Sequence, residues 1–226
     1  MKEEKEMKIK WYGHSCFLMT NSKGVRILTD PCDPSFGYAL RKTAADVLTV
    51  SHDHEDHNCI SVVTGNTQII RTAGEFEVSG IKIKGYETFH DKSKGSLRGT
   101  NIMFTYDIDD IRVLHCGDLG EIPSRKLLSS LGKIDVMLVP IGAIYTIDDF
   151  EARELANILK PSIVIPMHYK TPKLKKINLC PLTPFIDAAQ NCRIHNVNDC
   201  EVTITRQNLG EDRMLIVRPY DADRDE

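Results

Sequence analysis

The side chains best suited to chemistry in this sequence lie in residues 51–57, which read Ser-His-Asp-His-Glu-Asp-His. Side chains two residues apart in an extended segment point the same way, so His52 and His54 can reach one metal ion. A turn after them presents Asp56 and His57 to a second ion nearby. Imidazole and carboxylate ligands suit zinc, iron or manganese. Because this spacing seldom arises by chance, we interpret the run as a transition-metal site rather than a solvated polar loop.

Two metal sites need more ligands than this run provides, because a catalytic zinc ion usually takes three protein ligands and a water molecule. His90, Asp118 and His168 each come just after a predicted strand, where functional side chains gather in sheets of this kind. Taken singly, each has an ordinary explanation. A lone histidine at a strand end is often a surface residue, and an aspartate between glycines could make a turn. Their shared position predicts that all three complete the metal centre.

Short strands dominate the first half of the chain and must position these residues. Alternating apolar side chains between turn residues predict strands at residues 8–12, 16–20, 25–29, 46–50, 67–71, 81–86, 101–106 and 111–115. Asp109 and Asp110 predict a hairpin turn between the last two of these. Two further apolar strands, at 135–139 and 162–166, lie on either side of a helical pattern, and this order predicts a parallel crossover.

Helices are predicted at residues 123–131 and 147–160. The first opens with a proline, which suits the first turn of a helix. We expect Thr146 to cap the second helix, with Asp149 as the reciprocal carboxylate. Pro161 is expected to end it, because the residue before a proline avoids the helical conformation.

The C-terminal part of the chain carries a weaker pattern. Residues 171–184, with their prolines and lysines, predict a loop, and residues 201–206 with 213–217 predict a closing hairpin. We expect an ordered core over residues 7–218 and a disordered tail at residues 221–226.

Length and charge restrict the class of protein. The chain has 226 residues, 41% of them hydrophobic and 27% charged, which predicts a single globular domain over residues 1–226. Proteins that bind nucleic acid usually carry a basic domain or a clustered basic face, so the formal net charge of -3 argues against such a partner. A local positive site could still bind an anionic small molecule.

The cysteines and the apolar segments indicate the compartment. The 7 cysteines are scattered, and none forms a Cys-x-x-Cys pair, which favours a reducing environment. The first residues lack the apolar stretch of a signal peptide, and no window approaches the roughly 18 apolar residues of a spanning helix. We therefore expect a cytoplasmic protein with no membrane association. The sequence leaves the formation of a homo-oligomer open.

Phrases on either side of the candidate ligands carry a family resemblance. They read Trp11-Tyr12-Gly13-His14-Ser15, Leu28-Thr29-Asp30-Pro31, Gly117-Asp118-Leu119-Gly120, Val139-Pro140-Ile141-Gly142 and Pro166-Met167-His168-Tyr169. Together with the predicted ligands, they resemble the metallo-β-lactamase superfamily of metal-dependent hydrolases, over residues 8–170. The flanking phrases are similar to the branch that contains L-ascorbate-6-phosphate lactonase. The resemblance is specific for the fold and the metal site, and much less so for the substrate.

The resemblance implies a fold, a metal set and a reaction. The fold is an α/β four-layered αββα sandwich, with two mixed β-sheets facing each other, helices outside and the metals at one edge. Two divalent metal ions, zinc by preference, would be held, with manganese, iron and nickel also compatible with the ligands. A hydroxide bridging the ions would attack a lactone, ester or phosphoester bond in a small molecule. The residues implied are His52, His54 and His90 for one ion, Asp56, His57 and His168 for the other, and Asp118 as the bridge.

Some further roles follow from the same resemblance, and that of Asp30 follows from its position at the end of a strand. Asp56 and Asp118 are implied to be catalytic, and His14 is expected near the metals, where it would pass protons or bind substrate. Metal-bound histidines usually donate their second nitrogen to a carboxylate or carbonyl, and Asp30 is the candidate for that acceptor. A turn role remains the alternative for both His14 and Asp30.

Several residues near the predicted ligands have roles that stay open. Tyr145, Tyr169 and Lys170 follow strand ends and could contact a substrate anion, although such residues often lie on a loop surface. Cys59 and Cys116 are interpreted as small buried side chains, because seven other ligands already satisfy two metals.

Departures from better-known relatives narrow the function. Many zinc β-lactamases carry cysteine at the position of Asp118, so antibiotic hydrolysis is not expected. No flavin-binding domain and no long basic arm are present, which argues against a diiron reductase and against tRNA processing. Two alternatives to a small-molecule hydrolase remain. One is a phosphodiesterase acting on nucleotides or nucleic acid, and the other is a non-catalytic metal-binding module.

Overall fold

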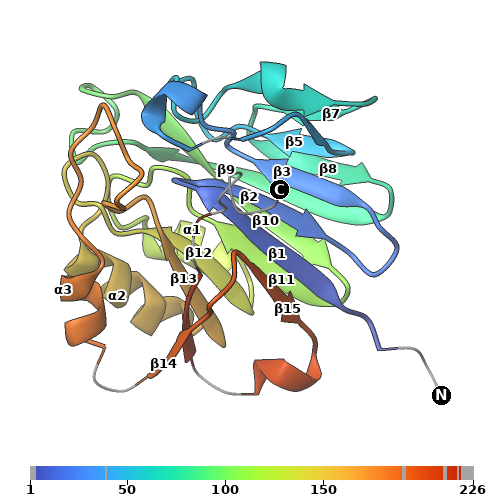
Figure 1. The fold of residues 1–226 in the computed structure, drawn as a ribbon. Coiled ribbons are helices and arrows are strands. Elements are labelled where there is room, and N and C mark those ends of the chain that lie inside the picture. Colours follow the sequence, from blue (N-terminus) through green and yellow to red (C-terminus); the bar gives the residue numbers. More distant parts are fainter. Residues whose placement is uncertain (1–3, 39, 190–191, 211–212, 218, 220–226) are drawn as a thin grey trace.

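The computed structural model describes residues 4–38, 40–189, 192–210, 213–217 and 219. Two β-sheets face each other in it (Figure 1). The predicted disordered tail at residues 221–226 lies outside the described residues. None of the described helices has the length and apolar character needed to cross a membrane.

The first sheet has six strands among the described residues. In spatial order they are β15 (Glu201–Ile204), β1 (Met7–Gly13), β2 (Cys16–Thr20), β3 (Arg26–Thr29), β5 (Val47–Thr49) and β7 (Gln68–Ile70). The pairs from β15 to β3 are antiparallel, and those from β3 to β7 are parallel. The sheet is therefore mixed, as expected.

The second sheet has eight strands in the described part of the chain. In spatial order they are β14 (Arg193–Asn196), β16 (Arg213–Ile216), β13 (Ile163–Met167), β12 (Val136–Pro140), β11 (Ile111–His115), β10 (Thr100–Ile108), β9 (Ile81–Phe89) and β8 (Gly74–Val78). The pairs from β8 to β11 are antiparallel and the rest are parallel. The predicted turn between β10 and β11 is confirmed, because Asp109 and Asp110 both have positive φ, as a tight hairpin requires.

The main core lies between the two sheets. Along β1, Met7, Ile9 and Trp11 are fully buried while the residues between them are more exposed. This alternation of two is what a strand with one face on a core shows. The same apolar cluster includes Phe104 and Tyr106 from β10 of the other sheet. Side chains from both sheets therefore form one continuous core.

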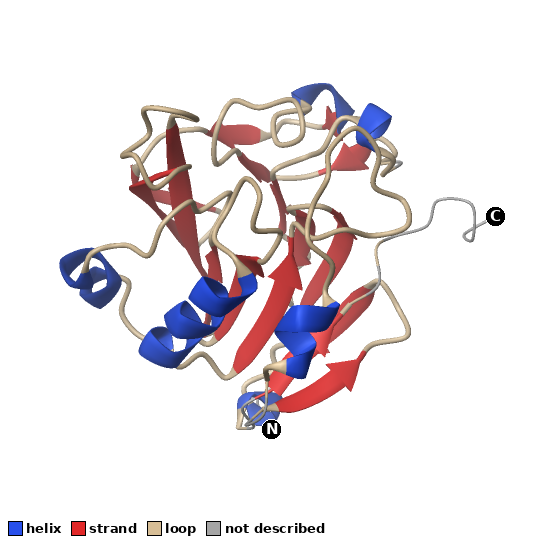
Figure 2. Ribbon diagram, turned by 90° about the vertical axis from the view of Figure 1, so that its left-hand side faces the viewer, coloured by secondary structure: helices blue, strands red, loops and turns tan. Residues whose placement is uncertain are grey.

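Three α-helices are described: α1 (Arg125–Ser130), α2 (Asp149–Leu159) and α3 (Thr183–Asp187). Figure 2 shows α2 and α3 in front of the strands of the eight-stranded sheet. Helix α2 connects β12 to β13, and these two strands are parallel neighbours, so the predicted crossover is confirmed. The predicted loop at 171–184 extends only to the start of α3.

The predicted cap of α2 was wrong. The N-cap is Asp148, whose carboxylate accepts from the backbone N–H of Glu151 at 2.8 Å, while Glu151 accepts from the N–H of Asp148 at 3.1 Å. The hydroxyl of Thr146 instead donates to the carbonyl of Ile147 at 3.0 Å. The N–H of Ile147 donates to the carbonyl of Leu119, so the chain is still tied to another loop there and is not yet helical.

The outer face of the six-stranded sheet is covered by short elements and not by α2 and α3. A second apolar cluster lies there, with Leu28 and Leu48 of the sheet packed against Leu40 and Val62. Around it lie a 3-10 helix, η2 (Ile60–Val62), and a short two-stranded sheet of β4 (Thr43–Ala44) and β6 (Val63–Thr64). Two further 3-10 helices are η1 (Pro34–Phe36) and η3 (Gln207–Leu209).

The predicted closing hairpin was also wrong. Strand β15 joins the six-stranded sheet beside β1, and β16 joins the eight-stranded sheet beside β13. The register places Ile204 opposite Met7 and Val202 opposite Ile9, so β15 extends the buried face of β1. Core burial against a distant strand therefore outweighs local pairing.

We expect Asp148→Ala to lower the free energy of unfolding by about 1 kcal/mol, because it removes the side-chain acceptor that caps α2. Asp149→Ala is the matched control. In the part of the chain that the structure describes, the side chain of Asp149 pairs with Arg153 on the helix surface, so its removal should cost less. Urea denaturation of both variants measures the difference. A larger loss for Asp149→Ala would contradict this assignment of the cap.

Candidate metal centre

The predicted site residues converge at one edge of the facing sheets. Each lies just beyond a strand: His14 in the turn between β1 and β2, Asp30 after β3, residues 52–57 after β5, His90 after β9, Asp118 after β11, and His168 after β13. The strands come from both sheets, so the site lies where the two sheets meet. Sequence position relative to strand ends therefore identified residues that are far apart in the chain and close in space.

Potential ligand atoms gather in three overlapping groups. In each group they all lie within 4.8 Å of one another, and the groups are His52, His54 and His90; His14, Asp56, His57 and His168; and His52, His57 and Asp118. The first group matches the first predicted ligand set, and the second contains the whole of the second set together with His14. The third group links the other two.

Asp118 lies at the centre of this arrangement. Its Oδ2 is close to Nε2 of four histidines, at 3.0 Å for His168, 3.2 Å for His57, 3.4 Å for His90 and 3.9 Å for His52. Burial alone would raise the pKa of the Asp118 carboxyl, but the neighbouring His168 and His57 hold it well below its usual range. The carboxylate is thus ionised and contacts histidines of both groups.

Asn101 holds Asp118 in place and was not identified from the sequence. The side-chain oxygen of Asn101 accepts from the backbone N–H of Asp118 at 2.9 Å. Its amide nitrogen donates to Thr88 Oγ1 and to the carbonyl of Cys116, each at 2.9 Å. Asn101 is fully buried, so all of these bonds replace contacts with water.

Gly117 allows this close approach. Its φ is +56°, and an added Cβ would lie 2.3 Å from Oδ1 of Asn101 and 2.7 Å from Cβ of Ser51. Only glycine adopts this conformation at no cost and leaves that room. In the Gly-Asp-Leu-Gly sequence, the first glycine is therefore needed for the backbone conformation, and the aspartate for the chemistry.

Asp30 contacts His57, as expected for a carboxylate that supports a metal-bound histidine. Nδ1 of His57 donates to Oδ2 of Asp30 at 2.9 Å, and Ser51 donates to the same carboxylate through its N–H at 2.7 Å and its hydroxyl at 2.6 Å. Burial would raise the pKa of Asp30, but the hydrogen bond from His57 lowers it overall. Since Nδ1 is occupied, the tautomer leaves Nε2 of His57 facing the site.

The site favours positive charge. Burial lowers the pKa of His57, yet the carboxylates of Asp118 and Asp56 raise it well above its usual value. By contrast, burial lowers the pKa of His52, and the neighbouring His57 lowers it further. Carboxylates that stabilise an imidazolium would stabilise a metal cation in the same place.

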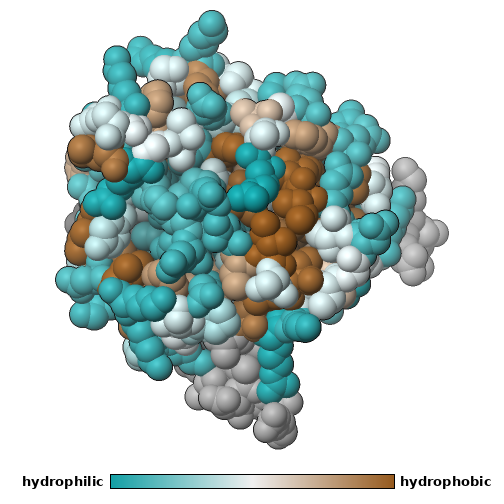
Figure 3. Space-filling model, turned by 90° about the horizontal axis from the view of Figure 1, so that it is seen from above, coloured by the Kyte–Doolittle hydropathy of each residue, from teal (hydrophilic) through white to brown (hydrophobic). Residues whose placement is uncertain are grey.

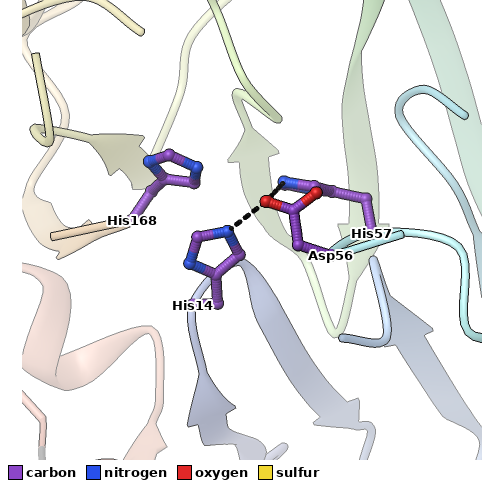
Figure 4. Close-up of side chains that lie close together, drawn as sticks. All are labelled: His14, Asp56, His57 and His168. Carbon is purple, nitrogen blue, oxygen red and sulfur yellow. Dashed lines mark hydrogen bonds and ion pairs between the residues drawn. The ribbon is translucent and has the colours of Figure 1, made fainter. Parts of the chain in front are cut away.

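His14 lies next to Asp56, with its Nε2 3.0 Å from the Oδ2 of that carboxylate (Figure 4). Its ring centroid is 4.1 Å from that of His168. Burial and the neighbouring His168 lower the pKa of His14 to about 4. His14 is therefore neutral near pH 7, and its Nε2–H donates to Asp56.

The donors present fit metal ions. Buried polar atoms normally have hydrogen-bond partners, but Nε2 of His52, Nε2 of His57 and Oδ1 of Asp118 have none among the described residues. All three belong to residues of one group of potential ligands, His52, His57 and Asp118. Imidazole nitrogen and carboxylate oxygen are the ligands that zinc and related divalent ions take in proteins.

The backbone is strained at three of these residues. His14, Asp30 and His168 have φ of 54°, 38° and 50°, in the left-handed region that other residues than glycine seldom adopt. The N–H of His168 donates to the carbonyl of His14 at 3.2 Å, which joins two of the strained turns. Such strain gathers at functional sites and is maintained by the surrounding structure.

The remaining candidates lie outside the cluster. His115 is fully buried, with Nε2 donating to the carbonyl of Ser15 at 2.9 Å and Nδ1 accepting from the N–H of Gly117 at 3.2 Å. Both of its nitrogens are therefore occupied by hydrogen bonds within the protein. Tyr169 is 6% exposed and packs on the indole of Trp11 at 5.4 Å, so it belongs to the core.

The other residues whose roles stayed open differ in their burial and their contacts. Cys116 is buried as predicted, and burial raises the pKa of its thiol, whereas Cys59 is half-buried. Lys170 is exposed, and its N–H donates to the carbonyl of Cys180. Tyr145 lies under the guanidinium of Arg98, 4.5 Å from the ring centroid.

Comparisons with known proteins agree with this geometry. The model of the beta-lactamase superfamily domain matches residues 8–168. A UPF0173 protein from Pyrococcus abyssi is 34% identical over 73% of this chain and 84% of its own length. A UPF0173 metal-dependent hydrolase from Thermoplasma volcanium is 32% identical over 74% of this chain and 85% of its own length.

A solved structure extends the match to the fold. It is that of a protein from Thermotoga maritima whose name places it among the Zn-dependent hydrolases of the metallo-β-lactamase superfamily. The two chains share 37% identity with a TM-score of 0.77, over 93% of this chain and 98% of the other. The structure of Igni18 from Ignicoccus hospitalis, 18% identical with a TM-score of 0.65, shares the fold.

This fold and these matches define a protein of the metallo-β-lactamase superfamily, which confirms the expected fold class. Within that superfamily, the chain belongs to the UPF0173 family of metal-dependent hydrolases. The comparisons do not single out the lactonase-like branch.

We expect Asp30→Asn to weaken metal binding by about 10–100-fold, because the carboxamide accepts less strongly from Nδ1 of His57. Competition with a chromogenic chelator measures the affinity. Asp46→Asn is the matched control, because Asp46 also accepts a backbone N–H, that of Arg26 at 2.7 Å, but lies outside the ligand groups. Equal metal affinities for Asp30→Asn and the wild type would show that Asp30 does not support a ligand.

Proposed function

We propose that this protein is a hydrolase that cleaves a lactone, ester or phosphoester bond in a small molecule with the aid of two divalent metal ions. The observation that carries the proposal is the position of Asp118. Its Oδ2 lies 3.4 Å from His90 of one ligand group and 3.0 Å from His168 of the other. A carboxylate placed between two groups of potential ligands can bridge a pair of metal ions.

The ligands divide between the two ions as follows. One ion would be held by His52, His54 and His90, the other by Asp56, His57 and His168, and Asp118 would contribute to both; the grouping of the potential ligand atoms supports this division. Each ion thus has three ligands of its own, which leaves positions for water and substrate. The ions, when bound, lower the pKa of water and polarise the carbonyl or phosphoryl group that is attacked.

The chain's own residues organise the reaction. Asp30 fixes the tautomer of His57, and Asn101 fixes the backbone of Asp118. Asp56 accepts the proton that the attacking water releases. His14, which donates to Asp56 at 3.0 Å, holds that carboxylate in position. Its pKa of about 4 keeps it neutral, so it does not compete with a cation for Asp56.

Zinc is the metal that we propose, although the ligands also suit manganese, iron and nickel. The name of the Thermotoga maritima relative describes a zinc-dependent hydrolase, which supports this choice. The phrases flanking the ligands, such as Trp11-Tyr12-Gly13-His14-Ser15, support a lactonase-like reaction.

The space beside the ligands suits a small substrate. A hollow of about 370 Å³ is lined by His52, His54, Arg71 and Arg98. Ligand sites commonly have volumes of about 300–1,000 Å³. Arg98 in this lining favours an anionic substrate, and it also makes a nucleotide phosphodiester the second candidate. Seen from above, the molecule has a hydrophilic, hollowed area beside a band of hydrophobic surface (Figure 3).

We also propose a cytoplasmic location. Six of the cysteines are free thiols: Cys16, Cys32, Cys59, Cys116, Cys180 and Cys200. Thiols persist in a reducing compartment, which supports this location.

Asp118→Ala should lower turnover by at least about 100-fold and reduce the bound metal, because it removes the ligand shared by both ions. The test is metal analysis of purified protein together with a panel of lactones, esters and phosphodiesters. His195→Ala is the control, since His195 lies exposed on β14, outside the ligand groups.

Circular dichroism and the urea midpoint check that the Asp118 variant folds. If it is folded and as active as the wild type, the bridging role is wrong. If the metal-loaded wild type hydrolyses no member of the panel, the hydrolase proposal is wrong and a binding module becomes the better interpretation.

A further inference from the structure

Two separate segments of the chain line the hollow beside the ligands. His52 and His54 belong to one segment, and Arg98 and Thr100 belong to the other. A substrate in this hollow can therefore reach the metal ligands and Arg98 at once. What Arg98 contacts then decides which substrates the site accepts.

A short loop fixes the backbone at Arg98. The carboxylate of Asp91 accepts from four backbone N–H groups, those of Ser93, Gly95, Leu97 and Arg98, at 2.7–3.0 Å. Asp91 follows His90, so the same turn that presents a predicted ligand also presents Arg98. The position of the arginine is thus tied to that of the metal centre.

The side chain of Arg98 is held by a second loop. Its guanidinium lies 4.5 Å from the ring centroid of Tyr145, which follows β12. An arginine stacked on an aromatic ring keeps its N–H groups at the edge free to donate. The stacking also limits the conformational entropy that Arg98 would lose on binding an anion.

Arg98 differs from its basic neighbours in how its positive charge is paired. Arg71, in the same hollow, donates to Asp53 at 2.8 Å, and Lys92, in the same loop, pairs with Glu151 at 2.7 Å. Among the described residues, the guanidinium of Arg98 contacts no carboxylate. Arg98 therefore carries the cation of this hollow that a ligand can neutralise.

We propose that Arg98, stacked on Tyr145, binds an oxyanion of the substrate, a phosphate or a carboxylate, at a point away from the bond that is cleaved. This rests on the proposed function and adds to it a substrate class, namely small lactones or esters that carry an acidic group. The planar guanidinium donates two parallel hydrogen bonds to such a group, which a lysine cannot do. Arg98 is thus a specificity-determining residue and takes no part in the bond cleavage.

Anion binding to the zinc-loaded protein tests the proposal without any need for turnover. Methyl phosphate and acetate are the probes, and calorimetry measures their affinities. Arg98→Gln should weaken the binding of at least one probe by about tenfold or more, and Arg98→Lys should restore it only in part. The Nε–H resonance of Arg98 should shift on titration with that probe.

Controls separate this role from a structural one. Arg153→Gln is matched, because Arg153 also lies over an aromatic ring, that of Phe150 at 5.8 Å, but on α2 and outside the hollow. It should leave both affinities unchanged. Tyr145→Phe should retain binding and Tyr145→Ala should weaken it, since only the second removes the ring.

The two probes distinguish the sources of the anion. A larger loss for methyl phosphate assigns the subsite to phosphate esters, and a larger loss for acetate assigns it to carboxylic acids. If Arg98→Gln is folded and binds both probes as the wild type does, the metals alone bind the anion and the proposal is wrong.

The outcomes also separate this proposal from that of the hydrolase. Weakened anion binding in Arg98→Gln, with no hydrolysis by the wild type, would support the subsite and contradict the enzyme. Hydrolysis by the wild type with unchanged affinities in Arg98→Gln would support the enzyme and contradict the subsite.

Discussion

The carboxylate of Asp118 lies buried among the imidazoles of His52, His57, His90 and His168, and the rest of the site is arranged around it. An ionised carboxylate in a protein interior is stable only when nearby positive charge and hydrogen bonds compensate for the lost hydration. Here the histidines supply the charge, and Asn101 fixes the backbone. A metal ion would compensate in the same way. The buried carboxylate therefore favours a cation beside it even before any metal binds.

This preference for a cation explains why the site lies where the two sheets meet. Histidines from both sheets must reach one carboxylate, and strand ends are the rigid points from which short turns can extend. His115 joins the sheets at that point, because it ends β11 and donates to the carbonyl of Ser15 between β1 and β2. The strained turns at His14 and His168 are hydrogen-bonded to each other across the same junction. Packing between the sheets thus sets the distances on which the chemistry depends.

Local patterns in the sequence predicted much of this arrangement. Residues 52–57 are close in the chain, and the other ligands share a position after an apolar strand, so both signals can be recognised without knowing the fold. Asn101 and Arg98 could not be found in this way. Asn101 binds the backbone of a residue 17 positions later, and Arg98 meets Tyr145 from another loop. The closing hairpin failed for the same reason, because β15 finds its partner in β1 at the opposite end of the chain.

The predicted metal ligands and the residues of the hollow also differ in how freely they can be substituted without loss of metal binding. The predicted ligands extend from strand ends whose neighbours are buried in the core, so we expect substitutions there to disturb folding as well as metal binding. Arg98 and Tyr145 lie on loops, and the side chain of Arg98 is exposed. Loops of this kind tolerate substitution while the scaffold stays constant. Proteins with the same metal centre can therefore differ in substrate. The proposed metal ligands therefore bear on the type of chemistry, and the proposed role of Arg98 bears on the choice of substrate.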